Sequence, residues 1–186
     1  MKQLLVALVT ASIGAAACSD SPSEPSGGTI TPTTFTVPLS PANEVPAIAN
    51  AEAGATGTAT IVLRITRNSG GTATAATADF QINASNFPAG STITMAHIHP
   101  GAAGSEGGIF VDTGLASGQL ALANGSGAIA RNGISVVPDQ AAAIAANPAG
   151  YYFNVHSAMN PDGVLRGQLS GGGATVDPGD STPVPY

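Results

Sequence analysis

The chain has 186 residues and is acidic and sparsely charged, with five basic residues, eleven acidic ones and a formal net charge of −6. An acidic surface without a basic patch repels phosphate backbones, which excludes nucleic-acid binding as a function. Aromatic residues make up 4% of the chain and glycine is abundant, a composition that favours a β-rich domain with flat surfaces of small residues.

The first 17 residues are typical of a secretory signal peptide, because Lys2 precedes an apolar run at 4–13 that is too short to span a bilayer. The four residues that end at Cys18, AAAC, resemble the lipobox of bacterial lipoproteins. That resemblance implies a diacylglycerol on Cys18 and cleavage before it. Ser19 then favours the outer membrane, facing the periplasm or the cell surface. Ala15 stands where the lipobox usually has leucine, so secretion after ordinary cleavage is the alternative.

Two segments with almost nothing to bury flank the central part of the chain. Residues 18–34 are rich in Ser, Pro, Gly and Thr and predict a disordered tether, and residues 171–186 predict a disordered tail of the same kind. Between them, 35–170 is long enough for one domain. Cys18 is the only cysteine, so packing and strand ladders must hold this domain together without disulfides.

Apolar residues alternate with polar ones along 55–67 and again along 76–83, which predicts two half-buried strands that form a hairpin. Pro138 and Asp139 followed by an alanine-rich run predict one short helix over 138–147. So many short strands between turns predict an all-β fold, an antiparallel Greek-key-like sandwich or barrel. The further strand candidates are 35–39, 92–98, 108–112, 117–123, 127–131, 150–156 and 164–169.

Four separated motifs, in this order, resemble the CHRD domain, the chordin-type module of extracellular proteins. The resemblance implies an extracellular β-domain. It does not imply growth-factor binding, because chordin's ligand binding is associated with cysteine-rich repeats that this chain lacks. The motifs are LSPANEVPA (39–47), ATGTATIVL (55–63), AHIHPGAAGSEGGIFVDTG (96–114) and AGYYFNVHSAMNPDGVLRGQL (149–169).

The three histidines of the chain fall within two of these motifs, His97 and His99 in the third and His156 in the fourth. On a strand, His97 and His99 share a face. With His156 they would give three nitrogen ligands for copper or zinc. AHIH also resembles the copper-binding strand of Cu,Zn superoxide dismutase, a β-sandwich, which suggests a superoxide-dismutase-like architecture. Dismutase chemistry needs more histidines than this chain has, and a disulfide.

A structural role for the histidines is the competing interpretation. In it, the imidazoles hydrogen-bond loop carbonyls and pair with acidic residues, fixing the loops at one end of the sandwich. The acids in reach are Glu44, Asp112 and Asp162.

A polar patch is predicted around the histidines if their two strands are neighbours. Asn154 shares the face of His156, Arg166 follows on the next strand, and Glu44 lies in the NEVP turn. Unbroken alternation from Ile93 would instead turn His97 and His99 inward, so a bulge near Met95 or Ala96 is needed.

Motifs for nucleophilic or nucleotide chemistry are missing from the sequence. The favoured hypothesis is therefore a non-catalytic, lipid-anchored extracytoplasmic module that binds a protein or glycan or organises the envelope. The alternative is a copper- or zinc-binding, or metal-dependent redox, protein centred on the three histidines.

Overall fold

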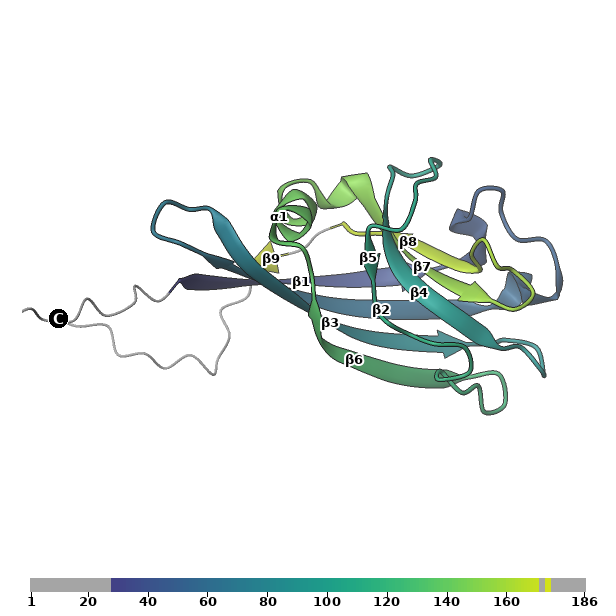
Figure 1. Ribbon diagram of the computed structural model, residues 1–186. Helices are drawn as coiled ribbons and strands as arrows, with labels where there is room; N and C mark the ends of the chain where they lie inside the picture. The colour runs from purple at the N-terminus through teal and green to yellow at the C-terminus, as the bar shows by residue number, and fades with distance from the viewer. Residues whose placement is uncertain (1–27, 171–172, 175–186) are drawn as a thin grey trace, which may run out of the picture.

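Long antiparallel strands form the larger of two sheets that pack face to face in the computed structural model, which describes residues 28–170 and 173–174 (Figure 1). The sandwich confirms the all-β fold predicted from the sequence. The five-stranded sheet has the order β6-β3-β2-β1-β9. Its strands are β1 Thr29–Leu39, β2 Thr56–Arg67, β3 Ala73–Ser85, β6 Gly127–Ser135 and β9 Gly173–Ala174.

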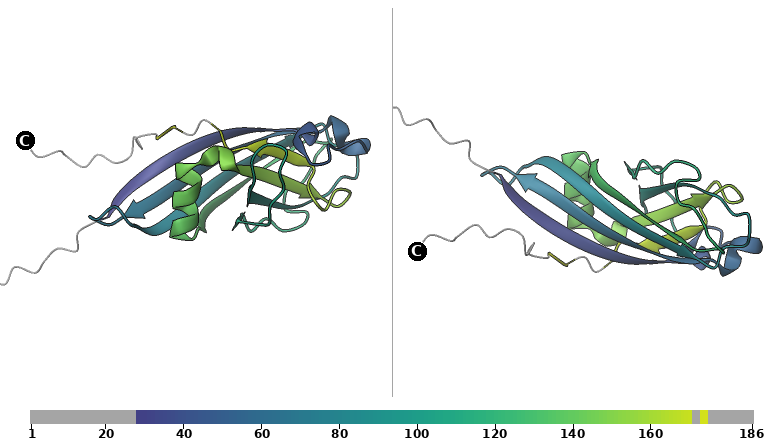
Figure 2. Two further views of the ribbon diagram at one scale, coloured as in Figure 1. Left: turned by 90° about the horizontal axis from the view of Figure 1, so that it is seen from above. Right: turned by 90° about the horizontal axis from the view of Figure 1, so that it is seen from below.

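The four-stranded sheet is shorter and lies over one end of the larger sheet, as the views in Figure 2 show. Its order is β5-β4-β7-β8. The helix α1 lies beside it on the same side of the larger sheet, and its Ala141 and Ile144 are buried (Figure 1). The bounds are β4 Ile93–Pro100, β5 Val111–Asp112, α1 Pro138–Ala146, β7 Tyr151–Ser157 and β8 Leu165–Gln168.

Alternation along β2 and β3 produces the core as the sequence predicts. Ile61 and Leu63 on β2 and Phe80 on β3 point inward and are at most 1% exposed, while Thr60 and Gln81, a register pair, lie on the other face. The inward residues of the four-stranded sheet complete the core: Ala96, Ile98, Phe153, Val155 and Leu165.

The first strand starts earlier than the sequence predicts. Residues 29–34, assigned above to a disordered tether, pair with β2 in a continuous register from Thr29↔Arg67 to Leu39↔Gly57. Proline is tolerated at Pro32 and Pro38 because β1 has only a two-residue partner, β9, on its other side. The ladder orders a segment whose composition alone resembles a linker.

The tail prediction, 171–186, also needs a correction at Gly173–Ala174, which pair with Thr33 and Thr34 of β1. Its other residues, like the signal peptide, the lipobox and most of the tether, lie outside the described residues.

Two further strand predictions were wrong or too long. The stretch 117–123 forms turns and irregular chain that ends in a single bridge between Ala123 and Ser126. Gly118 adopts a φ of 77°, which breaks a strand, and Leu120 is buried as a loop anchor. In 108–112 only the last two residues pair.

The predicted bulge is present in β4. Its register against β7 shifts between Ile93 and Met95, so Ile93 and Ala96 both face the core and both are fully buried. The shift places Met95, His97 and His99 on the opposite, outward face.

Backbone bonds between Ser40 and Arg166 close one side of the sandwich. The Ser40 N–H donates to the Arg166 carbonyl at 3.1 Å, and the Arg166 N–H donates to the Ser40 carbonyl at 3.2 Å. These bonds fix β8 beside the end of β1. In the described part of the chain, no helix has the length and hydrophobicity needed to cross a membrane.

Candidate metal centre

Three imidazoles gather on the outward face of the four-stranded sheet. His97 and His99 come from β4 and His156 from β7, next to it. Although the face points away from the core, their exposed fractions are only 2%, 6% and 6%, because the loops 101–110 and 158–164 lie over them. The sequence placed these residues on one face, and the structure brings them into contact.

The ring nitrogens of the three histidines converge. Nδ1 of His97 lies 3.2 Å from Nε2 of His156, and one nitrogen from each ring lies within 4.8 Å of the others. Two imidazole nitrogens on one tetrahedral metal ion, each bonded at 2.0–2.1 Å, are about 3.3 Å apart. The His97–His156 pair therefore already has the separation of two ligands of one ion.

Backbone carbonyls fix the orientation of two of the rings. Nδ1 of His99 donates to the Gly107 carbonyl at 2.9 Å, and Nδ1 of His156 donates to the Pro161 carbonyl at 2.9 Å. A carbonyl only accepts, so in the neutral rings Nε2 carries the lone pair. The loop-carbonyl bonds that a structural role predicts are thus present, and they are also the bonds that orient metal-ligating histidines.

Asp112 lies near the third ring. Its Oδ1 lies 3.6 Å from Nε2 of His97, directly across the β4–β5 ladder, which is too long for a hydrogen bond. Nδ1 of His97 instead donates to Nε2 of His156, whose own Nδ1 is the donor to Pro161. A metal ion bound by both rings would displace that proton, and His97 would then carry its proton on the Nε2 that faces Asp112.

Burial keeps the histidines neutral. It lowers the pKa of His97 to about 4, with the neighbouring His156 lowering it further and Asp112 opposing. Burial also lowers the pKa of His99 and of His156. Neutral imidazole is the form that binds metals. Within the described part of the chain, Nε2 of His99 is buried and has no hydrogen-bond partner, which is costly for a polar atom.

Tyr152 and Arg166 form a stack of side chains with His99. Its ring stacks on Tyr152, with centroids 5.0 Å apart and planes 8° apart, and the guanidinium of Arg166 lies 3.5 Å from the centroid of the same tyrosine. Arg166 donates to the carbonyls of Ala102 and Ser105 at 3.1 and 2.6 Å. It is 2% exposed, so it fastens the loop over the histidines and is not a solvated surface residue.

The loop itself is tightly fitted. A Cβ at Gly107, whose carbonyl accepts from His99, would lie 1.9 Å from the Pro100 carbonyl oxygen. The Gln168 side chain donates to the Gly101 carbonyl at 3.0 Å. Backbone contacts and the side chains of Arg166 and Gln168 on β8 therefore hold the 101–110 loop in place.

The predicted patch residues Glu44 and Asn154 lie beside Arg166 and do not contact the histidine nitrogens. Burial raises the pKa of Glu44 to about 7, against the opposing effects of Arg166 and Asn154. Glu44 Oε1 and Asn154 Oδ1 are buried without hydrogen-bond partners among the described residues. Glu44 lines two shallow pockets of about 300 and 320 Å³.

Sequence reasoning missed Glu52. Its side chain is fully buried and accepts bonds from Ser91, Ser157 and Asn160 at 2.6, 2.5 and 2.6 Å. These partners come from distant segments, so nothing in the local sequence reveals them. Glu52 ties the 3-10 turn Ala51–Gly54 to the end of β7, just beyond His156.

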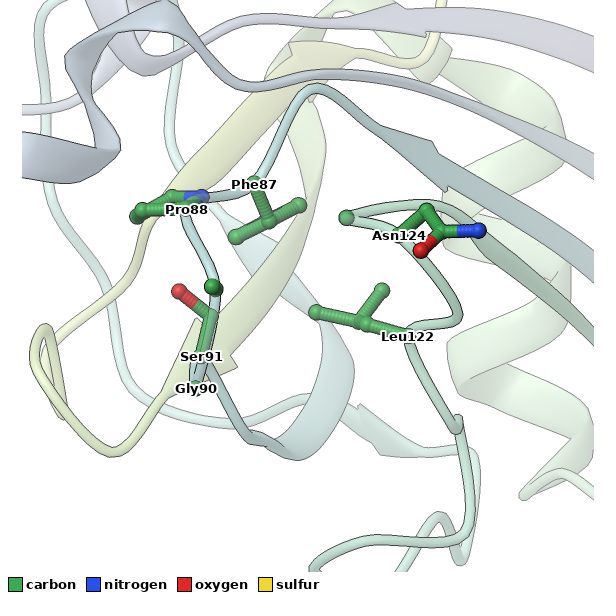
Figure 3. A pocket seen from close by; sticks show the side chains of 8 residues that line it. Phe87, Pro88, Gly90, Ser91, Leu122 and Asn124 are labelled. Carbon is green, nitrogen blue, oxygen red and sulfur yellow. The ribbon is translucent and has the colours of Figure 1, made fainter.

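Another pocket, of about 380 Å³, lies between the 87–91 and 122–125 turns (Figure 3). Its labelled lining includes Phe87, Pro88 and Leu122, with Ser91 and Asn124 as polar side chains. No charged residue or histidine lines it, so it offers little chemistry compared with the histidine cluster.

Comparison with known protein families agrees with the motifs. The family model of the CHRD domain matches residues 35–169, and the chain therefore belongs to the CHRD domain family. Searches of curated proteins and of solved structures find no match. Membership supports a structural or binding module.

Proposed function

We propose that this CHRD domain is a metal-binding module whose ligands are His97, His99 and His156. The observation that carries the proposal is the convergence of one ring nitrogen from each of three histidines in a buried cluster. Three imidazoles suit zinc and copper and are unsuitable for calcium or magnesium, which require oxygen ligands.

A binding role fits the site better than a catalytic one. The three rings are almost fully covered, and a catalytic metal needs an open position that a substrate can reach. The side chains of Arg166 and Gln168 bind the 101–110 loop. Because His99 also bonds to that loop, bound metal would connect β4 and β7 to it. The surface organised in this way would be the one offered to a protein or glycan partner.

The test is a metal titration, with Zn(II) and with Cu(II), of the metal-free full-length chain carrying Cys18→Ser, because the thiol would itself bind metal. We expect one equivalent to bind with a dissociation constant of roughly micromolar or below. His156→Ala and His97→Ala should each weaken binding by about 100-fold. Thr60→Val on the outer face of the other sheet is the matched control and should bind like the unchanged chain. Equal binding by all four proteins, or no binding tighter than about millimolar, would reject the proposal.

We also propose that the chain is a lipoprotein anchored through Cys18, with the domain outside the cytoplasm. The AAAC sequence and the apolar run at 4–13 support this. Two or three acyl chains would hold the protein firmly in a membrane. Cys18→Ser should move the protein from the membrane fraction to the soluble fraction. It should also abolish the incorporation of a radioactive fatty acid into the protein. Unchanged membrane association would contradict the anchor.

A further inference from the structure

A methionine lies beside the histidine cluster. Met95 is directly opposite His156 in the β4–β7 register, and residues paired in this way share a face with their Cβ atoms about 4.5–5.5 Å apart. On β4, Met95 lies two residues before His97 and four before His99, so all three point to the outward face. The thioether and the three imidazoles therefore share one face of two adjacent strands.

The position of Met95 is unusual for its residue type. It is 39% exposed, although methionine is usually buried. The bulge between Ile93 and Met95 accounts for this, since regular alternation from the buried Ile93 would turn Met95 inward. The same shift that brings the histidines outward thus also brings out a sulfur atom.

Sulfur changes which metal the site prefers. A thioether is a soft, uncharged ligand that favours Cu(I), whereas zinc and Cu(II) are well served by imidazoles alone. Three neutral imidazoles and one thioether make a four-ligand set without charge, which suits a singly charged ion better than a doubly charged one in a buried place. Asp112 remains outside this set, with its Oδ1 3.6 Å from Nε2 of His97.

We infer that Met95 is the fourth ligand and that the site is selective for copper in its Cu(I) form. This inference rests on the proposed function, because it adds a ligand to the same three histidines. It goes further in naming the metal and its oxidation state.

The experiment compares Cu(I) and Zn(II) affinities, measured by competition with chromophoric chelators under anaerobic, reducing conditions. All proteins carry Cys18→Ser, because a free thiol would itself bind Cu(I). Met95→Leu keeps the apolar volume and removes the sulfur. We expect it to weaken Cu(I) binding by about tenfold or more and to leave Zn(II) binding within about twofold. Met159→Leu, at the other methionine of the described chain, is the matched control and should change neither affinity.

A second readout uses protein labelled with ¹³C at the methionine methyl groups. On adding Ag(I), a non-oxidising analogue of Cu(I), the Met95 methyl resonance should shift and the Met159 resonance should stay in place. Unchanged Cu(I) affinity in Met95→Leu, or a shift at Met159 alone, would overturn the inference while leaving the histidine site standing. Failure of the Met95-containing protein to bind either metal would instead reject the proposed function itself.

Discussion

The two sheets of this sandwich differ in strand length and in the side chains on their outward faces. The five-stranded sheet has long strands, and its outward face carries threonines and amides with one ion pair, between Arg64 and Asp79. The four-stranded sheet has short strands, and its outward face carries three histidines, an arginine and an asparagine that are all nearly buried. The first outward face meets solvent, while loops cover the polar side chains of the second.

The difference separates the part of the fold that is held by regular ladders and apolar packing from the part that buries polar side chains. Regular ladders and an apolar core hold the larger sheet together, and the polar side chains on its outward face are exposed or half-buried. The smaller sheet packs on that platform and buries groups whose desolvation is unfavourable. Titratable groups whose pKa values are shifted by burial, like these histidines, cluster at functional sites.

The largest expected effect is in the core that joins the sheets. Phe80 is fully buried and stacks on Phe153, with centroids 5.9 Å apart. Phe80→Ala should lower the free energy of unfolding by about 3–5 kcal/mol, measured by denaturant titration. A loss below about 1 kcal/mol would mean that the five-stranded sheet is not the platform we describe.

In the four-stranded sheet, a substitution at Asp112 should affect metal binding and leave stability unchanged. Its side chain is 63% exposed, so Asp112→Asn should leave the stability of the metal-free chain almost unchanged. A metal on Nδ1 of His97 would leave the ring's proton on Nε2, which faces Asp112, so the change should weaken metal binding by about 10- to 100-fold, measured by competition titration. Unaltered metal affinity would show that His97 takes its orientation without this carboxylate.

Glu44, which follows the 3-10 turn Pro41–Asn43 and lies near Arg166 of the smaller sheet, gives the fold a pH dependence. Its pKa is raised to about 7 in the folded chain from a usual 4.5, so its stabilising effect is complete below pH 4.5 and is lost as pH rises through 7. Glu44→Gln should therefore raise the free energy of unfolding at pH 8 by about 1–2 kcal/mol and change it little at pH 4. Denaturant titrations at both pH values measure this. Equal effects at the two values would contradict a carboxyl group that is protonated in the fold.

The smallest effect is expected on the outward face of the larger sheet. Thr60 is half-buried there, opposite Thr36 and Gln81 in the neighbouring strands. Thr60→Val should change the free energy of unfolding by no more than about 0.5 kcal/mol and leave metal affinity as it is. A clear loss of metal binding would indicate that the two sheets are coupled, against the comparison drawn here.

The sequence was informative where one face of a strand is buried. Alternation predicted β2 and most of β3, and Pro138 and Asp139 predicted the start of α1, because burial imposes a period of two on a strand and proline suits a first helical turn. It was misleading at 29–34, where the order comes from pairing with β2 at residues 62–67. Composition carries no signal for a partner so distant in the chain.

Of the candidate site, the sequence could predict which residues share a face of the sheet. The sequence could place His97, His99 and His156 together once a bulge was assumed near Met95. It could not say which nitrogen of each ring would be free, because Gly107 and Pro161 supply the deciding carbonyls from loops. The sequence could not show what Arg166 contacts for the same reason: its partners Ala102 and Ser105 are more than 60 residues away.

The fastened loop over the histidines has a consequence for rates. With the three rings at most 6% exposed, an ion bound there would enter or leave when one of the two covering loops opens, and opening of the 101–110 loop requires the bonds from Arg166 and Gln168 to break. Exchange would then be limited by the frequency of that opening and not by the strength of the metal–nitrogen bonds. A domain of this kind would hold its ion through brief changes in the surrounding concentration, responding to the average supply of metal and not to its fluctuations.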